Sequence, residues 1–207
     1  VKLVVDDRTG RFSLYYLVDV TRNRYEPLLY DQETRTTYAT LMVDDRAYRL
    51  GDAPDFRIAV SRDAAGKVRV EYRSSFCVVR QVFSFVSSPG APMADGVAIE
   101  YSIENVSKAE SSIGLRVLLD TYVGEKSAAH FVAQSAGPLA SERALSGDYA
   151  DIWMRGLGSA DGSAANLQVL LSAPATRPDT LLAANWKRLN DSSWSFEANP
   201  SRNFTLL

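Results

Sequence analysis

Apolar and polar residues alternate along most of this chain with a period of two, and the 3.6-residue period of an amphipathic helix is weak. In GRFSLYYLV, for example, Phe12, Leu14, Tyr16 and Val18 fall on one face of an extended strand. Similar runs recur about every 8–14 residues and are separated by turn-forming groups such as GDAPD and RDAAGK. Residues 138–146 are open to two interpretations, one short helix or another strand. The pattern predicts an all-β chain.

We expect a single antiparallel β-sandwich domain that spans residues 1–207 and contains roughly 12–16 strands. The chain begins within the strand-like run VKLVV and finishes within another, NFTLL, and neither an initiator Met nor a signal peptide is present. The sequence therefore reads as a fragment truncated at both ends, so that targeting signals would lie outside it.

The segment 97–120 predicts a hairpin of two paired strands. If the odd-numbered apolar residues of both strands share a face, Tyr101 lies opposite Leu115. On the other face Glu100 then lies opposite Arg116, as a cross-strand ion pair worth about 0.2–1 kcal/mol.

The loop after this hairpin gathers polar residues into a candidate loop site made of Asp120, Thr121, Glu125 and His130. Asp-Thr at a strand end typically caps a turn through side-chain hydrogen bonds, and a histidine before Phe131 is typically packed or hydrogen-bonded. A ligand contact is the alternative, as is calcium held by oxygens of Asp120, Glu125, Asp148 or Asp151. A zinc site needs three or four ligands, which a chain with one His and one Cys can hardly supply. We therefore predict no metal and no cofactor.

Several catalytic motifs are missing from the sequence. A hydrolase triad would have to use His130, and no G-x-S-x-G elbow accompanies it. No glycine-rich phosphate loop opens a helix. Paired carboxylates for glycoside hydrolysis stay open as an alternative, with Asp120, Glu125 and Glu142 as candidates by position.

Composition narrows the class of partner. The net charge is −2 and the pI is near 5.5, which argues against nucleic acid. No apolar run is long enough to cross a membrane. The single cysteine, Cys77, lies in the strand-like run FCVVRQVFSFV and is predicted to be a buried small hydrophobe.

The three tryptophans each adjoin polar or charged residues. Aromatic rings flanked by Arg, Asn and Asp suit sugars, because the apolar face of the sugar stacks while its hydroxyls take hydrogen bonds. The alternative is that the tryptophans pack in the core or at sheet edges. The candidate ligand-binding residues are Trp186, Lys187, Arg188, Asn185, Trp153, Arg155 and Trp194.

The stretch VAIEYSIENVSKAESSIGLRVLLDTYVG resembles a segment of the galactose-mutarotase-like supersandwich domains, in which a strand of the form I-x-Y-x-I-x-N turns and returns toward the site. The resemblance covers 28 of the 207 residues. It implies a supersandwich fold, found in sugar epimerases and in non-catalytic parts of polysaccharide-active enzymes. The epimerases use two histidines and a glutamate, whereas this chain has Asp120 at the matching turn and one histidine in all, so mutarotase activity does not carry over. The pattern LLDT-x-x-GE-x(4)-HF is also similar to uncharacterised bacterial envelope proteins.

The sequence therefore predicts a non-enzymatic binding or structural module of the bacterial cell envelope, periplasmic or at the cell surface, that contacts a glycan or a partner protein. A carbohydrate-active enzyme that uses carboxylates is the first alternative. A purely structural assembly subunit is the second. Neither nucleic acid nor membrane insertion is expected.

Overall fold

The chain is all-β, with about half of its residues in strands of several open antiparallel sheets and about 3% in helix. The predicted fold class is confirmed. The computed structural model describes residues 1–30, 35–123, 130–147, 149–151, 153–157 and 165–204. Within these ranges, no helix has the length and apolar character needed to cross a membrane.

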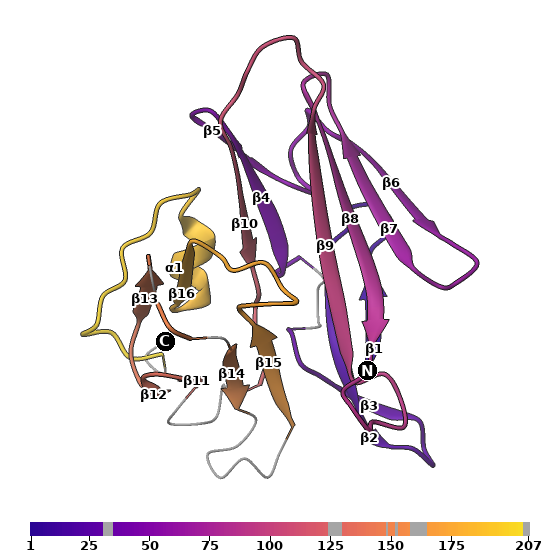
Figure 1. The fold of residues 1–207 in the computed structure, drawn as a ribbon, viewed down its shortest axis with the longest axis vertical. Helices are drawn as coiled ribbons and strands as arrows, with labels where there is room; N and C mark the ends of the chain where they lie inside the picture. The colour runs from indigo at the N-terminus through magenta and orange to yellow at the C-terminus, as the bar shows by residue number, and fades with distance from the viewer. Residues whose placement is uncertain (31–34, 124–129, 148, 152, 158–164, 205–207) are drawn as a thin grey trace. The chain divides into compact units, whose positions relative to one another are not determined.

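Backbone contacts divide the chain into two compact units, Val1–Leu119 and Asp120–Leu207. Figure 1 shows the strands of the first unit in indigo to magenta and the elements of the second in orange to yellow. The expectation of one sandwich domain over the whole length stays a prediction, and each unit is described by itself.

The first unit contains ten strands in the described residues, arranged in three sheets. The strand orders are β1-β2-β3, β10-β4-β5 and β6-β7-β8-β9. The strands are β1 (Lys2–Val5), β2 (Phe12–Asp19), β3 (Arg24–Pro27), β4 (Tyr38–Val43), β5 (Arg46–Arg49), β6 (Arg57–Arg62), β7 (Val68–Arg73), β8 (Cys77–Val86), β9 (Gly96–Asn105) and β10 (Ile113–Leu118).

The core of this unit forms where apolar faces of different sheets meet. Phe12 of β2 packs edge-on against Phe83 of β8, with ring centroids 5.0 Å apart. Tyr48 of β5 packs on Phe76, just before β8, at 5.2 Å. Cys77 is buried, as the sequence predicts, and burial raises the pKa of its thiol. These contacts between apolar sheet faces make the packing sandwich-like.

The predicted hairpin between the ninth and tenth strands is wrong. β9 pairs with β8 along its whole length, so that Glu100 lies opposite Val82, whereas β10 pairs with β4 and places Arg116 opposite Thr40. The even-numbered face of β10 is the more buried one, because Val117 is 41% exposed and Leu118 only 5%. The odd-numbered residues of β9 face inward as predicted, whereas the odd-numbered face predicted to be buried on β10 is its more exposed one. Alternation alone does not identify the partner strand.

A polar chain runs through the interior of the first unit. Gln81 is buried and donates from Nε2 to the Tyr101 hydroxyl at 2.8 Å. The Tyr72 hydroxyl donates to Gln81 Oε1 at 3.3 Å and lies 3.2 Å from the Thr9 carbonyl oxygen. Burial raises the pKa of Tyr72 far above its ordinary value. Both the N–H and the C=O group of the buried Gln81 amide therefore have hydrogen-bond partners, as buried polar groups normally do.

The second unit contains six strands and one short helix among the described residues. One sheet has the order β12-β11-β14-β15, and β13 pairs with β16. The elements are β11 (Phe131–Ala133), β12 (Gly137–Leu139), β13 (Arg143–Ser146), β14 (Trp153–Leu157), β15 (Asn166–Leu170), β16 (Thr180–Ala183) and α1 (Trp186–Asp191). The core cluster joins Ala133, Leu139, Met154, Leu171 and Ala183. Residues 138–146 thus contribute to strands β12 and β13, the second of the two interpretations above.

The strand-like run TLLAANWKRL forms a strand only in its first part, β16, and the helix α1 forms in its second half. Asn185 caps this helix, because its side-chain oxygen accepts from the backbone N–H of Arg188 at 3.3 Å. Leu189 lies on the buried face of the helix. On the exposed face, Lys187 Nζ pairs with the Asp191 carboxylate four residues later, at 2.6 Å. The asparagine before the helix was the local signal for this start.

Candidate functional site

The sheet β12-β11-β14-β15 has one buried face and one exposed face. Met154 and Gly156 of β14 point into the unit and are buried, as are Ala133 and Leu139 of the neighbouring strands. Strict alternation then turns Trp153 and Arg155 to the other face. The sequence therefore determines which residues of β14 reach solvent.

The exposed face is built by rows of residues that lie opposite one another. Arg155 lies opposite Gln168 of β15 on one side and Val132 of β11 on the other. Trp153 lies opposite Leu170, which is 47% exposed. We use the name Trp153 face for the set Val132, Pro138, Trp153, Arg155, Gln168 and Leu170.

Trp153 and Arg155 form a stacked pair on this face. The Arg155 Cζ atom lies 4.5 Å from the centroid of the Trp153 ring. Arg155 Nε donates to Gln168 Oε1 at 2.6 Å, which fixes the guanidinium over the indole. An arginine held in this way is attracted to the electron-rich ring face and keeps most of its N–H donors directed outward.

The chemistry of the Trp153 face combines apolar area with hydrogen-bonding groups. Trp153 and Leu170 offer a flat apolar surface, while Arg155 and Gln168 supply donors beside it. None of the six residues carries a carboxylate. Such a surface matches a sugar ring, which has an apolar C–H face and a hydroxyl-bearing edge.

The second predicted cluster, Asn185, Trp186, Lys187 and Arg188, lies on or beside α1 and mostly supports the fold. Arg188 forms an ion pair with Glu142, whose side chain is 0% exposed. Arg188 also stacks on the Phe196 ring, with its Cζ atom 4.8 Å from the centroid. Trp186 begins the helix and Trp194 follows it, and both are half-buried.

Glu142 connects three parts of the second unit. Besides the pair with Arg188, its carboxylate accepts from the backbone N–H of Asn199 at 3.0 Å and, more weakly, from that of Asn185 at 3.4 Å. Burial acts to raise the pKa of Glu142, but these hydrogen bonds and the guanidinium outweigh it and lower the pKa below its ordinary value. The Glu142 carboxylate is therefore kept ionised, and it links the three segments through its hydrogen bonds. A general acid would instead need a raised pKa.

An open groove of about 560 Å³ is lined in part by Glu142. Its rim includes the ring of Phe196 and two prolines, Pro138 and Pro200. Pro138 also belongs to the Trp153 face, so one residue contributes to both surfaces. The groove lies along the edge strand β12.

The candidate loop site is described only in part. Glu125 lies outside the described residues. Asp120 and Thr121 follow the end of β10 and are half-buried. His130 packs in an aromatic trio, with its ring centroid 4.8 Å from that of Phe131 and 5.8 Å from that of Phe204.

No group of three or more His, Cys, Asp or Glu side chains within the described ranges is placed to hold a metal ion. Asp148 and Glu125, two of the candidate calcium ligands, lie outside those ranges. Asp151 accepts from the Ser135 backbone N–H at 2.7 Å and from the Ser135 hydroxyl at 2.5 Å. Its pKa is lowered, because these hydrogen bonds outweigh the burial that would raise it. These hydrogen bonds from Ser135 to Asp151 stabilise the turn between β11 and β12.

Sequence reasoning missed Gln168 and Leu170 as members of the site. One signal was present in NLQVLLSA, where Leu167 and Val169 take the inner positions and Leu170 places an apolar side chain on the outer face. Their position beside Trp153 follows from the register between β14 and β15, which could not be predicted from the sequence pattern.

No family model matches this chain, and neither the curated proteins nor the solved structures contain a match. The resemblance to galactose-mutarotase-like domains therefore stays a prediction.

Proposed function

We propose that this chain is a non-enzymatic binding module that recognises a saccharide on the Trp153 face. The observation that supports the proposal is the exposed stack of Arg155 on Trp153, fixed by Gln168. Trp153 is half-buried on this face and lies opposite Leu170, and an arginine restrained over its ring supplies oriented donors to a ligand.

The proposed complex follows from the chemistry of the face. A pyranose ring lies with its C–H face on Leu170 and on the part of the Trp153 indole that the Arg155 guanidinium leaves uncovered. The hydroxyl groups at its edge accept hydrogen bonds from the Arg155 guanidinium. They can also donate to, or accept from, the Gln168 side-chain amide. Because Arg155 is already positioned in the unliganded protein, little side-chain entropy is lost on binding.

The enzymatic alternative has less support. Of its three carboxylate candidates, Glu142 is buried, ion-paired and lowered in pKa, and Glu125 lies outside the described residues. Asp120 alone does not form the pair of carboxylates that glycoside hydrolysis requires. The envelope location remains a prediction from the sequence.

Affinity electrophoresis in gels that contain single polysaccharides tests the proposal. Retardation of the chain by one polysaccharide, abolished in Trp153→Ala, would support it. Phe85→Ala is the matched control, because Phe85 is an aromatic residue of the first unit that is 50% exposed. Equal retardation of both variants, or no retardation by any polysaccharide, would refute it. Asp120→Asn should bind as the parent chain does, whereas the enzymatic alternative expects the same substitution to abolish turnover.

A further inference from the structure

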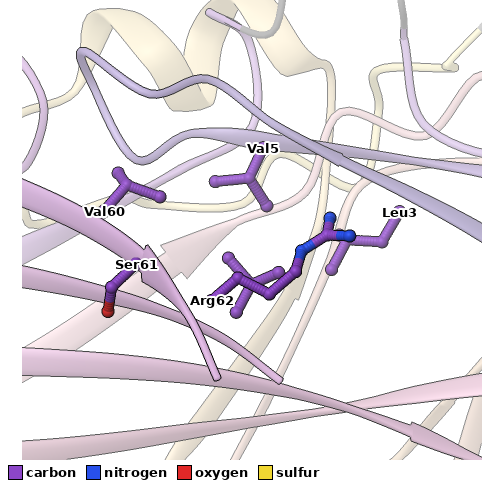
Figure 2. Close-up of a pocket in the computed structure, with 6 residues that line it drawn as sticks. Leu3, Val5, Val60, Ser61 and Arg62 are labelled. Atoms are coloured by element: carbon purple, nitrogen blue, oxygen red, sulfur yellow. The ribbon is translucent and has the colours of Figure 1, made fainter. Parts of the chain in front are cut away.

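A slot of about 240 Å³ opens between two strands of the first unit. Figure 2 labels five of its side chains, among them aliphatic groups from both strands and Arg62, whose guanidinium lies beside Leu3. The lining residues are Leu3 and Val5 of β1, Val60, Ser61 and Arg62 of β6, and Val68 of β7.

The two strands that border the slot are both sheet edges. β1 is the outer strand of the order β1-β2-β3, and β6 is the outer strand of β6-β7-β8-β9. Within the described part of the chain, each pairs with a single neighbour, β2 and β7 respectively. A row of backbone N–H and C=O groups along each strand is therefore directed away from its own sheet, which is the geometry that accepts an added strand.

The side chains in the slot belong to the core faces of both sheets. Val5 lies opposite Phe12, and Val60 opposite Val70, and both of these partners are buried. Val5 and Val60 are nevertheless half-exposed, as is Leu3. The apolar interior of the first unit thus reaches solvent along this side, and an inserted strand would cover it.

The charge of the β6–β7 hairpin indicates which kind of strand fits. Residues 57–73 contain five basic and two acidic side chains, although the whole chain has a net charge of −2. Arg57 and Arg62 stand at the two ends of β6 and are both exposed. One of the two acids, Glu71, is already shared between Arg73 and Arg80.

The same charge disfavours a second copy of this chain as the occupant. Two copies that pair through β6 bring two basic hairpins side by side, and like charges across an interface repel. A strand with acidic residues beside Arg57 gains from the same geometry.

We infer that this slot binds an extended, acidic segment of a partner protein, which adds to β6 as a further antiparallel strand. Alternate apolar side chains of the segment enter the slot against Leu3, Val5 and Val60. Its acidic residues lie on the other face of the added strand, next to Arg57. The backbone hydrogen bonds supply affinity and the alternation supplies register.

Binding of a short capped peptide in which valine and threonine alternate with glutamate tests this inference. Fluorescence anisotropy measures the affinity, and amide hydrogen exchange of the full chain locates the site. We expect binding that slows exchange in residues 57–62, and a loss of affinity of about tenfold in Arg57→Glu, on the scale of a paired interfacial charge. The same peptide with lysine in place of glutamate should bind the parent chain weakly and Arg57→Glu more tightly.

Arg22→Glu makes the same change in net charge on the β2–β3 turn, where Arg22 is 79% exposed, and should leave peptide binding unchanged. Equal affinity for the acidic and basic peptides would overturn the inference. So would protection confined to other strands, or concentration-dependent protection of β6 without peptide, which would identify a second copy as the occupant.

Discussion

Arg155 lies over the indole ring of Trp153, two residues earlier on β14, with its Cζ atom 4.5 Å from the ring centroid. The two side chains share the exposed face of a sheet whose other face is packed into the core. The stack therefore lies outside the core cluster of the second unit. This is why we assign it to recognition rather than to folding.

Gln168 should tune binding without affecting stability. Replacing Gln168 by Leu removes the acceptor that holds Arg155 Nε and lets the guanidinium leave the indole. We expect saccharide affinity to fall by about 3–10-fold, the worth of one hydrogen bond of about 0.5–1.5 kcal/mol. Titration calorimetry with the retarding polysaccharide measures the loss. An unchanged affinity would show that the position of Arg155 does not matter.

Glu142 should matter for stability. Glu142→Gln removes the charge that compensates Arg188 and weakens the contacts with Asn199 and Asn185. We expect the second unit to lose about 2–4 kcal/mol, because breaking a buried ion pair leaves its partner uncompensated. All three tryptophans belong to this unit, so their fluorescence during urea unfolding reports on it alone. The exposed neighbour Glu197→Gln is the control and should change the unfolding free energy by less than about 0.5 kcal/mol.

The second unit should lose stability in acid. The pKa values of Glu142 and Asp151 are lower in the folded state than in the unfolded state, so around pH 4 the unfolded chain binds more protons. Their contribution is complete above the unfolded pKa values, near pH 4, and is lost as pH falls through the folded ones. Urea midpoints measured by tryptophan fluorescence should therefore fall between about pH 5 and pH 2, and less steeply in a variant that combines Glu142→Gln with Asp151→Asn. A midpoint that stays level or rises on acidification contradicts this assignment.

Gly10 should tolerate no side chain. Its φ is +70°, and a Cβ atom would lie 2.3 Å from the Tyr72 hydroxyl oxygen and 2.4 Å from a Val70 methyl carbon. We expect Gly10→Ala to cost about 2–4 kcal/mol, since it combines backbone strain with overpacking. Gly66→Ala is the matched control, because Gly66 has φ +80° and open space around it, and should cost only about 1 kcal/mol. Circular dichroism during urea unfolding compares the two, and equal losses would show that the contact with Tyr72 is not restrictive.

The sequence was sufficient for the fold class because alternation is a local property. The inward and outward residues of β9 follow directly from it, as do those of β14. Strand pairing is not local. Tyr101 lies opposite Gln81 of β8, whereas the pattern predicted Leu115 as its partner. Register can be inferred from patterns only when the partner strand is known.

The candidate site divides in the same way. Trp153 and Arg155 could be proposed from composition and spacing, because both lie on one strand. Gln168 could not, since its position beside Arg155 depends on the register of β14 against β15, which no local pattern determines. Arg188 stays a predicted ligand contact. Its ion pair with Glu142, 46 residues away in the sequence, could not be predicted, because no local pattern marks that partner.

The most direct test of the saccharide-binding proposal is a titration of the isotope-labelled chain with neutral and acidic oligosaccharides, followed by amide and indole chemical shifts. We predict that one oligosaccharide shifts the Trp153 indole N–H together with amides of residues 153–157 and 166–170, and that Trp153→Ala removes the response. Shifts confined to residues 138–144 and 196–200 would assign binding to the groove instead. The absence of shifts on the Trp153 face with every oligosaccharide would contradict the proposed function.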